Sequence, residues 1–231
     1  MELKYLLFSE NGYREVTPEE MALPYGISPK EICPQMPLGD LLRALGQIKG
    51  ISNVSPGFLD PSRPLVIRSE KHGPYYHVCS LGDEDRAYLC LLVAITERAK
   101  ALLASDLKYL TLLRERFAPY FPEVYGLIEI EIKGIHISVG ILEWLCSYHE
   151  IHAVMTPSGI FFEFWDPVSI RLLDQREIYH FFSHSAEILL LCYDPIQNRR
   201  ITGWSHITGD FVYDPTIEAP NPVFLTTIRG Y

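Results

Sequence analysis

Apolar residues recur at spacings of four and three in the middle of the chain, in the order Leu103, Leu107, Leu110, Leu113 and Phe117. This spacing aligns their side chains along one face of an α-helix. Thr96 stands at the position of an N-cap, and Pro119 cannot continue a helix, so both ends are marked. The sequence therefore predicts one long amphipathic helix, which needs an apolar surface to cover its leucines.

Short strand patterns stand on both sides of this helix. Before it come PLVIRSE, PYYHVCSL and RAYLCLLVAIT, which predict a three-stranded antiparallel sheet. After it, LIEIEIKG and IHISVGILEWL alternate apolar with polar residues and predict a hairpin that turns at Lys133-Gly134. We therefore expect the α+β class: an antiparallel sheet with one long helix packed on it, followed by a smaller α+β carboxy-terminal lobe.

Proline interrupts the first 63 residues so often that long regular elements cannot run through them. One helix fits there, from Leu38 to Lys49, because its leucines share a face and Gly50 can end it. We interpret residues 1–63 as a Pro-rich arm or cap, residues 64–148 as a sheet-plus-helix lobe and residues 149–231 as the smaller lobe. Together they are expected to form one integrated globular unit.

Composition narrows the setting in which the chain works. With 48% hydrophobic residues among 231, it can bury a sizeable core, and its net charge of -9 disfavours nucleic acid and anionic membranes as partners. The first residues lack the basic start of a signal peptide, and the apolar runs are shorter than the roughly 20 residues of a membrane helix. Scattered cysteines without a CxxC pair favour reduced thiols. We expect a soluble cytoplasmic protein, and its 14 tyrosines leave a protein partner or self-association open.

The last part of the chain carries another strand pattern, GIFFEFWD, and a helical stretch from about Gln175 to Tyr193, for which a break near Ser183–Ser185 is an alternative to a continuous helix. His180 and His184 lie four residues apart in this stretch, so both imidazoles can point the same way. A partly buried polar edge of a helix explains the pair. The alternative is a metal or catalytic role, for which any third ligand must come from elsewhere in the chain.

The order of these elements over residues 64–166 resembles the amino-terminal lobe of protein kinases: a strand hairpin, a strand that ends in Val93-Ala94-Ile95, a long helix, a second hairpin and then Glu143-Trp144-Leu145. The resemblance implies that Glu143, Trp144 and Leu145 occupy the place of the hinge, where kinase backbone groups hydrogen-bond adenine. It also implies a lysine directly after the VAI tripeptide, to hold ATP phosphates. Thr96 stands there instead, and no Gly-rich phosphate loop precedes it.

The kinase comparison offers two candidate aspartates. Asp166 follows an apolar strand, as the metal-binding aspartate of a kinase does. Asp210, in the segment from His206 to Phe211, resembles the aspartate of the His-Gly-Asp loop of small-molecule kinases. If Asp210 accepts a hydrogen bond from His206, that histidine is a candidate general base. The alternative interpretation is a β-turn between two strands.

The run His149-Glu150-Ile151-His152 combines imidazoles with a carboxylate, which are ligands for zinc, iron or nickel. Its histidines are three residues apart, whereas a helical HExxH site places them four apart. In an extended chain they would lie on opposite faces. His149 and His152 are therefore candidates for a metal site, with a solvated loop as the alternative.

These residues together predict a catalytically degenerate, kinase-like protein that acts in binding, regulation or as a scaffold, with no cofactor. The alternative is an enzyme built on the segment of His206 and Asp210. It would be a divergent phosphotransferase that uses ATP-Mg or a metal-assisted hydrolase that uses zinc.

Overall fold

The computed structural model describes residues 3–9, 12–23, 36–48, 63–73, 75–166, 169–204, 208–217 and 221–231. The chain divides into two compact units, the first made of Met1–Ala104 and Val124–Cys146, the second of Ser105–Glu123 and Ser147–Tyr231. The division passes through the long helix α4 (Glu97–Phe117). The first unit includes the short helix α1 (Pro18–Ala22) and the other described elements of the segment interpreted as an arm or cap.

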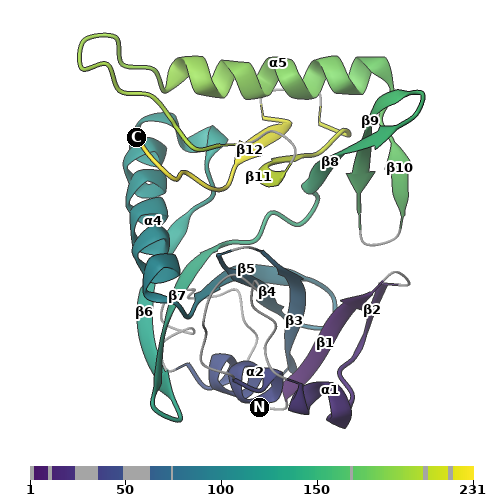
Figure 1. The fold of residues 1–231 in the computed structure, drawn as a ribbon, viewed down its shortest axis with the longest axis vertical. Helices are drawn as coiled ribbons and strands as arrows, with labels where there is room; N and C mark the ends of the chain where they lie inside the picture. Colours follow the sequence, from purple (N-terminus) through teal and green to yellow (C-terminus); the bar gives the residue numbers. More distant parts are fainter. Residues whose placement is uncertain are drawn as a thin grey trace. The chain divides into compact units, whose positions relative to one another are not determined.

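A mixed sheet with seven described strands forms the first unit, in the order β2-β1-β3-β4-β5-β7-β6 (Figure 1). β1 runs parallel to β3, and each of the other neighbouring pairs is antiparallel. The strands are β1 (Leu3–Ser9), β2 (Gly12–Glu15), β3 (Leu65–His72), β4 (His77–Gly82), β5 (Ala87–Ala94), β6 (Val124–Ile132) and β7 (Ile135–Glu143). The predicted three-stranded sheet corresponds to β3, β4 and β5 within this larger one.

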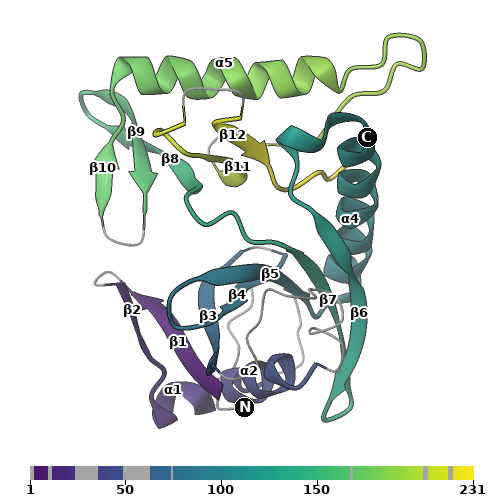
Figure 2. The ribbon, with the colours of Figure 1, turned by 180° about the vertical axis from the view of Figure 1, so that it is seen from behind.

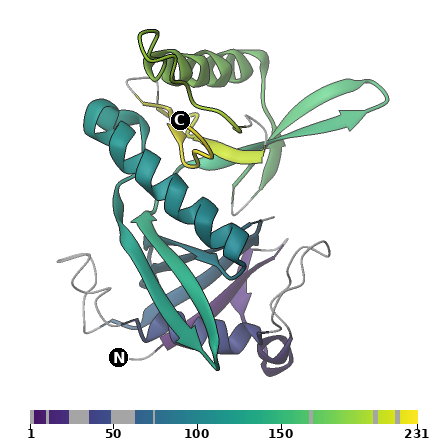
Figure 3. The ribbon, with the colours of Figure 1, turned by 60° about the vertical axis from the view of Figure 1, so that its left-hand side comes forward.

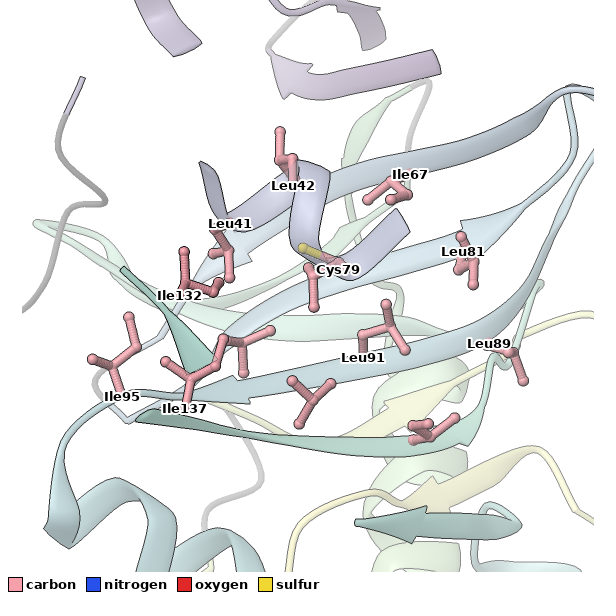
Figure 4. Close-up of a cluster of buried hydrophobic side chains, with 14 of the residues drawn as sticks. Leu41, Leu42, Ile67, Cys79, Leu81, Leu89, Leu91, Ile95, Ile132 and Ile137 are labelled. Carbon is pink, nitrogen blue, oxygen red and sulfur yellow. The ribbon is translucent and has the colours of Figure 1, made fainter. Parts of the chain in front are cut away.

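Helix α2 (Leu38–Gly46) closes the core of the first unit (Figure 4). Its Leu41, Leu42 and Leu45 are fully buried. They cluster with alternate side chains of the strands, among them Ile67, Cys79, Leu81, Leu89, Leu91 and Ile137. The described members of this cluster include none from α4. The helix predicted in the Pro-rich segment thus covers this core.

The two local predictions around α4 are confirmed. Leu103, Leu110 and Leu113 are fully buried, as their spacing indicated. A single turn of 3-10 helix, η1 (Ala118–Tyr120), follows the helix at Pro119. The β6–β7 hairpin turns at Lys133 and Gly134, whose φ angles are 51° and 80°. Two successive positive φ angles match the right-handed twist of the flanking strands, so this turn closes the hairpin directly.

A second sheet, with five described strands, forms the second unit together with helix α5 (Gln175–Leu191) (Figure 2). The strand order is β10-β9-β8-β11-β12, and neighbours are antiparallel. The strands are β8 (His149–Thr156), β9 (Gly159–Trp165), β10 (Ile170–Leu172), β11 (Thr208–Tyr213) and β12 (Val223–Leu225). α5 lies along one face, where Phe162 meets Phe182 and Phe181 meets Phe211, with ring centroids 5.3 and 6.4 Å apart.

Helix α5 begins with a capping box between Asp174 and Glu177 and runs without a break through Ser183–Ser185. The hydroxyl of Ser185 donates to the carbonyl of Phe181 at 2.8 Å, so this polar side chain is satisfied inside the helix. The predicted α+β class is confirmed. Among the described helices, none has both the length and the apolar character that crossing a bilayer requires.

Candidate functional site

Thr96, at the place of the kinase lysine, caps helix α4. Its hydroxyl accepts a hydrogen bond from the N–H of Ala99 at 3.1 Å, which satisfies one of the free donors in the first turn. The nearest lysine in sequence, Lys100, pairs with Glu97 at 2.7 Å on the same helix. Thr96, Glu97 and Lys100 therefore stabilise the first turn of α4.

The segment predicted to bind a nucleotide base continues the sheet of the first unit. Glu143 pairs with Leu89 of β5, and the N–H of Trp144 donates to the carbonyl of Tyr88 at 3.0 Å. Glu143, Trp144 and Leu145 are all partly buried. In a kinase hinge, backbone N–H groups are free to bind adenine. Here the N–H of Trp144 is already bonded to the backbone of β5.

Asp210 lies on β11, and its carboxylate is only 2% exposed. Both of its oxygens are bound by Arg229: Nη1 donates to Oδ2 and Nη2 to Oδ1, each at 2.6 Å. Such a two-point, charge-assisted pair is strong and fixes the orientation of both groups. Arg229 Nη1 also donates to the carbonyl of Gly203 at 2.6 Å. The carboxylate thereby ties β11 to the segments that carry Gly203 and Arg229.

Of the predicted pair of His206 and Asp210, only Asp210 lies within the described residues. His206 lies outside the described residues, so its hydrogen bond to Asp210 stays a prediction. Arg229 is 19 residues from Asp210 in the sequence, and no local pattern indicates their pairing.

Asp166 closes the connection between β9 and β10. Its carboxylate accepts the N–H of Ser169 at 2.7 Å and the hydroxyl of Ser169 at 2.9 Å. The N–H of Asp166 in turn donates to the carbonyl of Ser169 at 3.1 Å. These bonds are those of an Asp-initiated turn, so the candidate metal-binding aspartate has a structural task.

His149 and His152 lie on opposite faces of β8. His149 meets the buried ring of Phe164 at 5.4 Å, whereas His152 stacks on Trp165 at 4.1 Å. Burial lowers the pKa of His149, against the opposing effect of the carboxylates of Asp166 and Asp214. Because the two rings point apart, they cannot bind one ion together. Within the described residues, no three or more His, Cys, Asp or Glu side chains form a group that could hold a metal.

The face of β8, β9 and β10 that is turned away from α5 is rich in exposed apolar side chains. Strand register places Trp165 between Glu150 and Ile170, and Glu163 between His152 and Leu172. Trp165, Ile170 and Leu172 are 42%, 60% and 56% exposed. We call this surface the open face; its residues are Glu150, His152, Val154, Phe161, Glu163, Trp165, Ile170 and Leu172.

The charged groups of the open face are acidic. Glu163 accepts a hydrogen bond from Trp165 Nε1 at 3.0 Å, and Glu150 lies 3.2 Å from His152 Nε2. Arg171 is the one arginine or lysine of these three strands; it pairs with Glu177 of α5 at 2.9 and 2.6 Å, on the other face. The run Ile160–Trp165 indicates this surface in the sequence. Alternate residues of a strand face opposite sides, and this run has apolar residues on both sides.

Comparison with protein-family models, with curated proteins and with solved structures found no match for this chain.

Proposed function

We propose that this chain is a non-catalytic, kinase-like protein that binds a protein partner. The order of β3, β4, β5, α4, β6 and β7 along the chain supports the kinase-like part of the proposal. The non-catalytic part rests on Thr96, Asp166 and Asp210, whose polar groups are engaged in a helix cap, a turn and a buried ion pair. A group held in this way is poorly placed to exchange protons or ligands during a reaction.

The observation that carries the binding role is the open face. Exposed apolar residues scattered singly are normal, whereas four on one face of a sheet favour an interaction site. On the open face, Phe161, Trp165, Ile170 and Leu172 lie around Glu163. Trp165 and Phe161 supply the aromatic area that protein interfaces favour, and Ile170 and Leu172 extend it to the edge strand β10. Figure 3 shows the hairpin of β8 and β9 projecting from the rest of its unit.

Charge complementarity selects the kind of partner. Glu150 and Glu163 give the open face a negative potential, and the chain as a whole carries a net charge of -9. A second copy would bring the same acidic groups, which disfavours self-association through this surface. A segment that combines apolar side chains with lysine or arginine fits both features. We therefore assign a basic, apolar protein segment as the occupant.

Selection of peptides from a random display library on the purified chain tests this assignment. We expect the selected peptides to carry lysine or arginine beside apolar residues, and to bind more weakly as salt is added. Trp165→Ala should weaken the selected peptides at least tenfold in fluorescence polarisation, since buried aromatic anchors dominate interface energies. Leu172→Ser serves as a second variant on the same face.

Tyr179→Ala is the matched control, because Tyr179 is a 76% exposed aromatic residue on α5, away from the open face. It should leave the affinity unchanged. Selected peptides that bind Trp165→Ala and Leu172→Ser as well as they bind wild type would contradict the proposal. Sedimentation showing a dimer that Trp165→Ala dissociates would replace the basic partner with a second copy.

A further inference from the structure

Two imidazoles on α5 form a hydrogen bond with each other through their Nε2 atoms. His180 Nε2 and His184 Nε2 are 3.1 Å apart, and the ring planes cross at 87°. Both rings are partly buried on the polar edge of the helix, with 20% of the His184 side chain exposed. Solvent can therefore reach the pair, while the helix fixes the positions of both rings.

The outer nitrogen of each ring lies beside an oxygen. His180 Nδ1 is 3.2 Å from the hydroxyl of Tyr213. His184 Nδ1 is 3.3 Å from a carboxylate oxygen of Glu187, yet this buried nitrogen has no aligned hydrogen bond. Tyr120 donates its hydroxyl to the other oxygen of Glu187 at 3.3 Å. A small rotation of the His184 ring would complete a hydrogen bond from Nδ1 to Glu187.

Two features of this arrangement match those of metal-binding histidines. Two nitrogens on a tetrahedral ion at roughly 2.0–2.1 Å from the metal are about 3.3 Å apart, close to the observed separation. A ligating imidazole usually donates its other N–H to a carboxylate or another oxygen, which fixes the tautomer and the ring direction. Glu187 and Tyr213 are placed to accept those N–H groups.

We propose that His180 and His184 bind a divalent transition-metal ion of the zinc class through their Nε2 atoms. Glu187 is a positioning residue, which acts through His184. The hydroxyl of Tyr213 lies 3.2 Å from His180 Nδ1 and orients that ring. With two protein ligands, the remaining positions fall to water or to a donor atom of a bound molecule, which makes this an open site.

Calorimetric titration of the tag-free chain with zinc chloride tests the proposal. We expect one saturable site that is weakened at least tenfold in His180→Ala and in His184→Ala. His136→Ala is the matched control, because His136 is a 71% exposed histidine on the β6–β7 hairpin; it should bind as wild type does. Glu187→Gln should weaken zinc severalfold while both ligands remain.

Cobalt(II) supplies a second readout, because its visible spectrum reports the ligands directly. Wild type should develop d–d bands in the visible region that His184→Ala lacks, with circular dichroism confirming that the variant is folded. Zinc binding that persists at wild-type strength in both His180→Ala and His184→Ala would overturn the proposal. So would the absence of any saturable site in the wild-type chain.

Discussion

Asp210→Ala is expected to lower the free energy of unfolding by about 3 kcal/mol, because it leaves the guanidinium of Arg229 without its anion. The side chain of Asp210 is almost completely buried, at 2% exposed, whereas the side chain of Arg229 is 27% exposed. Because Arg229 is partly exposed, we expect a loss of stability at the lower end of the range for broken buried ion pairs. Urea unfolding followed by tryptophan fluorescence measures it.

A double-mutant cycle with Arg229→Ala separates the ion pair from the other roles of each residue. The losses of stability in the two single variants should add up to more than the loss in the double variant. Asp85→Ala is the control, because its carboxylate is 72% exposed and pairs with Arg63 at the surface; its midpoint should equal that of wild type. An Asp210→Ala protein as stable as wild type would show that this carboxylate does not hold the fold.

Leu42→Ala should cost about 3 kcal/mol of stability, within the range for a buried leucine that leaves a cavity. Leu42 is fully buried in α2 and packs in the core of the first unit. The result separates a helix that belongs to the core from one in a dispensable arm. Thermal and urea unfolding of the full chain provide the measurement.

Leu190→Ala is the matched control for Leu42→Ala, since Leu190 is also helical but 73% exposed. Its loss removes little buried area, and alanine favours the helix, so no destabilisation is expected. If Leu42→Ala unfolds at the same urea concentration as wild type, α2 does not close the core.

Local patterns in the sequence predicted elements whose stabilising contacts lie within a few residues. The leucine spacing of α4 and the turn at Lys133-Gly134 are of this kind, because helical periodicity and turn chemistry depend on near neighbours. The parallel pairing of β1 with β3 joins Tyr5 to Ile67, and no local pattern specifies such a distant partner. The same holds for the choice of α2 as the helix that covers the core.

At the candidate site, too, near neighbours were predictable from the sequence and distant partners were not. The spacing of His149 and His152 was enough to place them on opposite faces of an extended strand, as the structure has them. The spacing of His180 and His184 was enough to bring their rings together. The partners that define these groups come from elsewhere in the chain: Arg229 for Asp210 and Tyr213 for His180. Tertiary packing brings those residues together, so the sequence alone could not assign their roles.

Thermal unfolding of the wild-type chain with and without ATP-Mg shows whether this chain, which we propose is kinase-like, binds a nucleotide. A nucleotide at 100 times its dissociation constant would stabilise a binding protein by about 2.7 kcal/mol and raise the melting temperature by several degrees. We predict no change in melting temperature at millimolar ATP-Mg, because Thr96, Asp166 and Asp210 are engaged in structure. A saturable rise with ATP-Mg that Asp210→Asn abolishes would contradict the account and favour the divergent phosphotransferase.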